Sequence, residues 1–230
     1  MQELKHPYIT VAKEHKHFYG GSQMLSASTN MREVGCGVIA ALDLLLYLCR
    51  FHEGCGSGFF AEAAADGVID SEEYDALAQR LSRRYFPLIP KLGINGLMLA
   101  AGLNVFFRRY GFPLRARWGV GSRRLFEEIE EQLAQDLPVI LSIGPNFPLI
   151  WKKDTLCFYL PGHEDGSGSA CSVRAHYVTV TGIDGRYLHI SSWGRPYLID
   201  REEYLRYIRR SSGSLVSNFV HLRHTGKRRL

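Results

Sequence analysis

The sequence contains no apolar run of the ~18 residues that a membrane-spanning helix requires. The run that follows Cys36 comes nearest, and Asp43 interrupts it. Residues 1–16 mix acidic and basic side chains with few apolar ones, which is not the pattern of a secretory signal. We therefore expect a cytoplasmic protein that binds no membrane.

Cysteine is also sparse, and its spacing is irregular. An odd number of cysteines without a regular pattern argues against a disulfide scaffold and fits a reduced cytosolic chain. No second pair repeats the spacing of the first two thiols after the apolar run, so we expect no metal site and no other cofactor. The five cysteines are Cys36, Cys49, Cys55, Cys157 and Cys171.

The chain has no internal repeat, no low-complexity segment and no basic stripe with interleaved aromatic residues. Its formal net charge of +5 is modest, and three of the positive charges lie at the end, in residues 227–229. We therefore expect no nucleic-acid partner. Hydrophobic residues make up 46% of the 230 positions, which is the composition of a globular protein.

A cysteine stands between two glycines, directly before the apolar run. Apolar residues recur at helical spacing from Val38 to Leu48, which predicts a core helix with Cys36 at its N-terminus. Free N–H groups and the helix dipole favour an anion there. We therefore predict a lowered thiol pKa and alkylation well below pH 8, with Gly35 and Gly37 leaving room for a substrate carbonyl. The alternative is a small buried residue at a tight helix start.

Residues 175–194 have the alternation of a β-hairpin, with Asp184 and Gly185 at the turn. His176 then stands at the open end of the first strand, and Ser191 and Ser192 stand at the open end of the second. Because paired strands lie ~4.8 Å apart, we expect these side chains to be close together. A nucleophile, a base and a group that orients the base are what thiol catalysis requires.

Three short motifs follow one another in a fixed order: Cys-Gly before a long apolar helix, His-Tyr-Val-x-Val-x-Gly-Ile on a strand, and Ser-Trp-Gly. In this order they resemble the papain-like cysteine peptidases, and most closely the C39-like, bacteriocin-processing-type peptidases of bacteria. The resemblance covers residues 30–193. It implies an α+β papain-like fold in a single domain, residues 1–230. A mainly helical lobe, residues 1–112, would carry Cys36 and pack on a β-rich antiparallel lobe, residues 113–230, that carries His176.

Local patterns predict the elements that surround these motifs. Apolar spacing and capping residues indicate helices over 71–85 and 93–110, a third helix that Ser122 caps, and a fourth that begins after Asp200. Strands are predicted at 7–11, 137–144, 196–200 and 215–222, the last of them closing the sheet. The long connection 145–174 is predicted to cover the cleft between Cys36 and His176, with Trp151 and Tyr159 as its apolar contacts.

The resemblance also assigns the oxyanion site. Papain-like enzymes place a glutamine six residues before the cysteine, and its side-chain amide helps to bind the oxyanion. Asn30 stands at that offset and offers the same donor on a shorter side chain. The backbone N–H of Cys36 would be the second donor. An ordinary loop asparagine is the alternative for Asn30.

The third catalytic position departs from the family. Papain-like enzymes carry an asparagine before Ser-Trp-Gly and C39-like members carry an aspartate, whereas this chain has Ser191, followed by Ser192 as a second candidate for orienting the base. Serine accepts a hydrogen bond from imidazole but brings no negative charge. Asp154 or Asp200 could substitute for it, while Asp184 belongs a strand length away.

Three functions are consistent with these residues. The first is a cysteine peptidase or amide hydrolase that attacks a peptide or protein substrate with Cys36 through a thioester intermediate. The second is an acyltransferase that uses the same thioester. The third is a weak or inactive relative that binds a peptide or protein partner in its cleft; Ser191 favours it, and the retained Cys36 and His176 argue against it.

Overall fold

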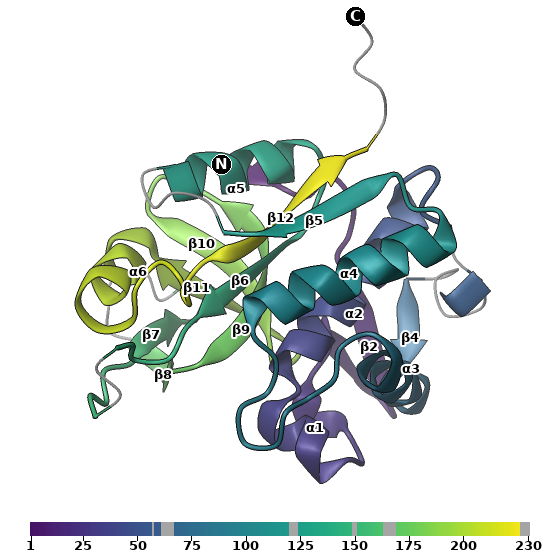
Figure 1. The fold of residues 1–230 in the computed structure, drawn as a ribbon, viewed down its shortest axis with the longest axis horizontal. Helices are drawn as coiled ribbons and strands as arrows, with labels where there is room; N and C mark the ends of the chain where they lie inside the picture. Colours follow the sequence, from purple (N-terminus) through teal and green to yellow (C-terminus); the bar gives the residue numbers. More distant parts are fainter. Residues whose placement is uncertain (57, 61–66, 120–123, 149–150, 163–168, 226–230) are drawn as a thin grey trace, which may run out of the picture.

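The protein is described by a computed structural model that covers residues 1–56, 58–60, 67–119, 124–148, 151–162 and 169–225. It is a mixed α+β structure in which helices pack on a large antiparallel sheet (Figure 1). None of the described helices is long and apolar enough to cross a lipid bilayer.

The large sheet collects strands from both ends of the chain. Its order is β5 (Leu114–Trp118), β12 (Phe219–His224), β6 (Val139–Ile143), β9 (His176–Ile183), β10 (Tyr187–Ser192), β11 (Arg195–Asp200), β7 (Leu156–Tyr159) and β8 (Ser169–Val173), and β1 (Gln2–Glu3) also pairs with β9. A smaller sheet has the order β3 (Lys16–Tyr19), β2 (Thr10–Lys13) and β4 (Val68–Asp70).

The helices predicted after Cys36, over 71–85 and 93–110, before the strand at 137–144 and after Asp200 are present, whereas the sequence does not predict the one at Thr29–Val34. The helices are α1 (Thr29–Val34), α2 (Cys36–Phe51), α3 (Ser71–Arg84), α4 (Gly96–Tyr110), α5 (Leu125–Ala134) and α6 (Arg201–Tyr207), with short turns η1 (Gln23–Leu25), η2 (Gly58–Phe60) and η4 (Ile208–Ser212). Gly111 ends α4 in the left-handed conformation, and Asp200 caps α6 through its side chain. The predicted cap Ser122 lies outside the described residues.

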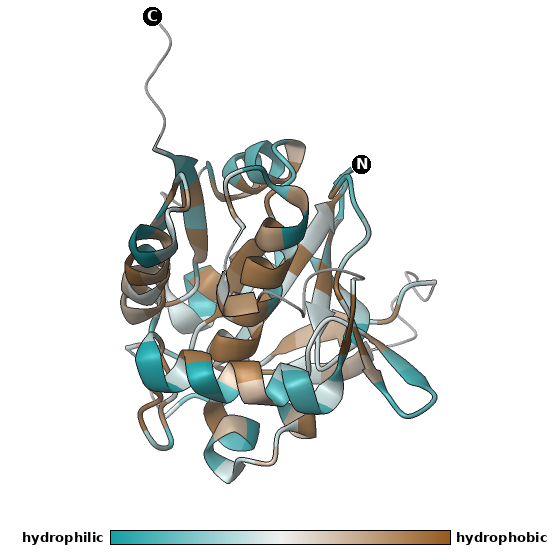
Figure 2. Ribbon diagram, turned by 90° about the vertical axis from the view of Figure 1, so that its right-hand side faces the viewer, coloured by the Kyte–Doolittle hydropathy of each residue, from teal (hydrophilic) through white to brown (hydrophobic). Residues whose placement is uncertain are grey.

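The sheet separates two hydrophobic cores because successive residues of a strand point to opposite faces. In β6, Ile140 joins the core formed with α2, α3 and α4, whereas Val139 and Leu141 join the core formed with α5 and α6. The sheet is therefore covered on both faces. Hydrophobic residues concentrate on the elements in the middle of the molecule (Figure 2).

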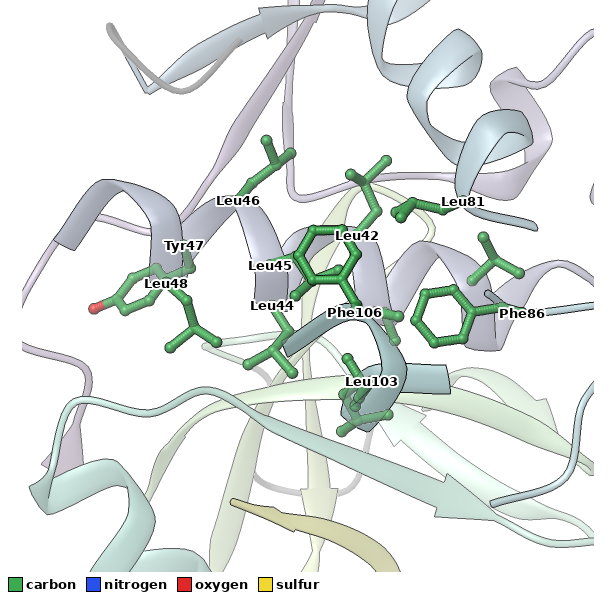
Figure 3. Close-up of a cluster of buried hydrophobic side chains, with 14 of the residues drawn as sticks. Leu42, Leu44, Leu45, Leu46, Tyr47, Leu48, Leu81, Phe86, Leu103 and Phe106 are labelled. Carbon is green, nitrogen blue, oxygen red and sulfur yellow. The ribbon is translucent and has the colours of Figure 1, made fainter. Parts of the chain in front are cut away.

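Helix α2 runs through the first core. Its residues from Gly37 to Leu48 are buried, which explains a sequence that is apolar nearly all round. Figure 3 shows the leucines of α2 packed against Leu81, Phe86, Leu103 and Phe106 from the neighbouring elements. Contacts on every side fix the position of the helix, and with it the position of its first residue.

Three sequence predictions about the fold are wrong. In the described part of 145–174, β7 and β8 extend the sheet beyond β11, where the sequence predicts a loop over the cleft. Trp151 is 72% exposed and Tyr159 donates to Glu203, so neither is the predicted apolar contact. The last strand, β12, does not close the sheet, since it lies between β5 and β6. The strand predicted at 7–11 begins later, at Thr10, and runs to Lys13 as β2.

Truncating a leucine of α2 should destabilise the protein strongly. Leu45 is fully buried, so Leu45→Ala leaves a cavity and should lower the free energy of unfolding by about 2–5 kcal/mol. Leu97 is 65% exposed, so Leu97→Ala serves as the matched control and should change it little. Urea unfolding of both variants measures the difference, and equal losses would contradict the central place of α2.

Candidate active site

Cys36 is the first residue of α2, as the sequence predicts. The two glycines beside it serve packing rather than substrate approach. A Cβ at Gly35 would overlap the side chain and carbonyl of Met31, and a Cβ at Gly37 would lie 2.6 Å from the Ile94 side chain. Glycine is needed at both positions because Met31 of α1 and the side chain of Ile94 pack closely against the start of α2.

His176 is the first residue of β9, and its pairing with Ile143 of β6 fixes its position along the strand. The backbone N–H groups of Tyr177, the residue after His176, and of Gly37 and Cys36 itself lower the pKa of the Cys36 thiol, against the effect of burial. Cys36 and His176 line the same small cavity of about 20 Å³ and the same larger cleft of about 630 Å³. The fold therefore brings together two residues that are 140 positions apart in the sequence.

The His176 ring is held from two sides. Its Nε2 lies 2.8 Å from the Ser192 hydroxyl, and its face stacks on Trp193 with ring centroids 4.4 Å apart. Trp193 and Gly194 both have positive φ and form the two-residue connection between β10 and β11, which is the backbone of a tight hairpin turn. This turn places the indole over the imidazole and shields it from water.

Ser192, not Ser191, is the hydroxyl that contacts the base. The prediction for Ser191 is wrong because neighbouring strand residues point to opposite faces: Ser192 shares the His176 face, whereas Ser191 turns away and donates to the Tyr19 carbonyl at 2.7 Å. Ser191 lines the small cavity, but its hydroxyl anchors the end of β3.

Asn30 does not reach the site. It is exposed on α1 and lines neither the small cavity nor the cleft. The side-chain amide that lines both is Gln23, which is 7% exposed and donates from Nε2 to the Arg32 carbonyl at 2.7 Å. The offset of six fails because α1 is inserted between the amide and the cysteine.

The other carboxylates named from the sequence also lie elsewhere. Asp154 accepts from Ser211, and Asp200 caps α6. Asp184 is held by His189 at the far hairpin turn, 2.8 Å from its ring nitrogen. None of the three lines the small cavity or the cleft, so the hydroxyl of Ser192 is the group bonded to His176.

Burial sets the protonation of the pair. It raises the pKa of the Cys36 thiol, although three backbone N–H groups act in the opposite direction. It also lowers the pKa of His176 to about 4. The expected lowering of the thiol pKa is therefore wrong, because desolvation of the thiolate outweighs the helix N-terminus. At neutral pH the site holds a neutral thiol beside a neutral imidazole.

The cleft beside Cys36 is mostly apolar. The segment before α4 and the start of α4 line it, with Leu92 80% exposed and Leu97 65% exposed, and the exposed Leu215 lines it as well. Glu33 and Lys91 are the charged residues along it. An extended chain with apolar side chains fits such a cleft.

The sequence offers a signal for Gln23, which the motifs do not include, and for the turn at Trp193, to which they assign no role. A Gly-Gly-Ser-Gln run, residues 20–23, places an amide directly after a tight turn, and a Trp-Gly pair between two alternating stretches marks a two-residue hairpin. Neither signal says which residue lies next to Cys36, because that depends on how distant segments pack.

The two serines should behave differently when they are truncated. Ser192→Ala removes the hydrogen bond to Nε2 and should slow acylation of Cys36 by p-nitrophenyl acetate about tenfold, since the imidazole loses its orientation. Ser191→Ala should leave that rate nearly unchanged and lower the free energy of unfolding by about 1 kcal/mol. Mass spectrometry of the acetylated Cys36 peptide and urea unfolding measure the two effects. A slower Ser191 variant with a normal Ser192 variant would reverse the assignment.

Protonation of His176 should weaken the fold in acid. Its folded pKa of about 4 lies below the unfolded value near 6.5, so the unfolded chain binds more protons between these limits. The residue therefore lowers stability as the pH falls from 6.5 to about 4, by roughly 3 kcal/mol in all. Relative to His176→Asn, the wild type should lose that amount between pH 7.5 and pH 4 in urea unfolding. A constant difference would show that His176 is not buried as described.

No protein-family model, curated protein or solved structure gives a significant match to this chain. The resemblance to papain-like peptidases therefore depends on the residues of the chain alone. Cys36, His176, Ser192 and Gln23 together line the small cavity, and this arrangement is the ground on which a function is proposed below.

Proposed function

We propose that this protein is a cysteine peptidase or a related amide hydrolase of papain-like fold, with Cys36 as nucleophile and His176 as base. The observation that carries the proposal is the shared cleft: a cysteine at a helix N-terminus and a histidine at a strand end line it together. A nucleophile, a base and a group that orients the base are the elements that acyl transfer to a thiol requires.

Proton transfer begins the reaction. We assign the ring hydrogen to Nε2, which then donates it to Ser192 and leaves Nδ1 of His176 as the nitrogen with a lone pair. Nδ1 takes the proton of the Cys36 thiol as the sulfur bonds to the substrate carbonyl carbon. The thiol and the imidazole are both neutral at rest. Charge therefore develops only as the sulfur–carbon bond forms, and His176 acts as a general base.

The oxyanion then needs donors. One is the backbone N–H of Cys36 at the start of α2, and the other is the Gln23 amide, whose second N–H remains after the bond to the Arg32 carbonyl. Collapse of the tetrahedral intermediate breaks the C–N bond, and the imidazolium gives its proton to the departing amine. A thioester on Cys36 remains, and water activated by His176 hydrolyses it.

The cleft supports a peptide-like substrate. Exposed apolar side chains along about 630 Å³ beside Cys36 offer contact to the side chains of an extended chain. An acyltransferase would use the same thioester and pass the acyl group to an amine, and a non-catalytic binder would use the cleft alone.

Replacing the base should separate an enzyme from a binder. His176→Ala should slow acetylation of Cys36 by p-nitrophenyl acetate at pH 7 by 10²- to 10⁴-fold, because the general base is lost. The other four thiols are internal references and should react at unchanged rates. Peptide mapping by mass spectrometry follows each cysteine in one experiment.

If Cys36 reacts no faster than the other thiols, or if His176→Ala does not change its rate, both enzyme proposals are contradicted. The non-catalytic binder is then the function that remains. If the acetyl thioester forms, its loss with and without an added amine distinguishes hydrolysis from transfer. Hydrolysis in water alone supports the peptidase proposal, and release only to the amine supports the acyltransferase.

A further inference from the structure

Helix α2 carries one carboxylate in its buried stretch. Asp43 lies seven residues after Cys36 and is 2% exposed, and it lines the small cavity together with Cys36 and His176. The mechanism above makes no use of it. A buried carboxylate without a structural or chemical task is costly, so its contacts indicate its role.

Hydrogen-bond donors surround the Asp43 carboxylate. Tyr74 donates to Oδ1 at 2.7 Å and Tyr8 donates to Oδ2 at 3.0 Å. The backbone N–H of Gly21 lies 3.1 Å from Oδ1 and 3.0 Å from Oδ2. In the part of the chain that the structure describes, tyrosines are the only titratable side chains that bond to it. The Tyr19 ring lies tilted beside that of Tyr8, with centroids 5.0 Å apart.

The Gly20–Gly21 turn fits closely against this carboxylate. A Cβ at Gly20 would overlap the Ser191 hydroxyl and lie 2.6 Å from Oδ2 of Asp43, and a Cβ at Gly21 would overlap the Tyr74 hydroxyl. Gly20 also has φ of 75°. The two glycines therefore allow the backbone to reach Asp43, which ties this turn to α2.

Gln23 follows this turn by two residues. Its backbone begins η1, which Ser22 caps, and its amide is held by the Arg32 carbonyl. The turn is thus fixed at Gly21 by the helix that carries Cys36. The position of the Gln23 amide relative to the Cys36 sulfur therefore depends on the hydrogen bond from the Gly21 N–H to Asp43.

We propose that Asp43 is a positioning residue that, as a carboxylate, holds the Gly20–Gly21 turn on α2 and thereby keeps the Gln23 amide at the oxyanion position. The inference rests on the proposed function, since it assigns a supporting residue to the same site. Asp43 acts through Gln23 and touches no reacting atom.

The charge of Asp43 gives this role a pH dependence. Burial raises the pKa of Asp43 to about 6, against hydrogen bonds from Tyr74, Gly21 and Tyr8 that lower it. Above that pH the carboxylate accepts the Gly21 N–H as an anion. Below it the group is protonated, the charge-assisted bond is lost, and the Gln23 amide should contribute less.

A double-mutant comparison across pH tests this inference. The measured quantity is the amide factor: the rate of Cys36 acetylation by p-nitrophenyl acetate divided by the rate in the same protein with Gln23→Ala. In the wild type it should be about 10²–10³ at pH 8 and fall as the pH drops through about 6. In Asp43→Asn it should be at least tenfold smaller at pH 8 and should not change with pH.

Three controls separate positioning from general damage. Tyr74→Phe removes one hydrogen-bond donor and should raise the pKa of Asp43. The decrease of the amide factor should therefore occur at higher pH, while its value at pH 8 stays that of the wild type. Asp154→Asn removes a carboxylate outside the site and should match the wild type. Alkylation of Cys36 by iodoacetamide at pH 8 forms no oxyanion and should be equal in all of these proteins.

A wild-type amide factor near one, or an Asp43→Asn factor equal to that of the wild type, would overturn the inference. If Asp43→Asn does not fold, an unmoved pH midpoint in Tyr74→Phe would overturn it as well. Failure of the proposed function is seen separately, as acetylation of Cys36 that does not depend on His176.

Discussion

The burial of α2 is the constraint on which the site depends. Its side chains contact α3, α4 and the sheet on every side, so the helix cannot rotate or slide without exposing or overpacking leucines. The first residue of the helix is held as firmly as the core itself. Because β9 packs against α2, the same contacts fix His176 relative to Cys36, and the backbone N–H of Tyr177 lowers the thiol pKa where the two elements meet.

The sheet decides which polar groups join this pair. Strand alternation turns Ser192 toward His176 and Ser191 toward the end of β3. The turn at Trp193 and Gly194 adds an aromatic face to the imidazole. A chain one residue longer or shorter in β10 would exchange the two serines, so register is as important to the proposed chemistry as the identity of the residues.

Burial and nearby hydrogen-bond donors have opposite effects on the pKa values of Cys36 and Asp43. The helix N-terminus and three N–H groups favour a thiolate, yet burial favours the thiol and the neutral imidazole more strongly. The resting Cys36–His176 pair is therefore uncharged, and in the proposed mechanism charge separates only as a substrate carbonyl accepts it. Asp43 shows the same balance: a buried carboxylate whose pKa of about 6 is kept that low by tyrosine and backbone donors.

The sequence by itself determined most of the helices, the β9–β10 hairpin, and the places of Cys36 and His176 in them. Helical spacing placed Cys36 at the start of α2, period-two alternation placed His176 at the start of β9, and capping residues such as Asp200 located helix starts, because these patterns depend on local geometry. Only the tertiary structure decided that Gln23 rather than Asn30 and Ser192 rather than Ser191 lie beside them, and that the thiol pKa is raised. These outcomes depend on contacts between segments far apart in the chain and on burial, which no local pattern encodes.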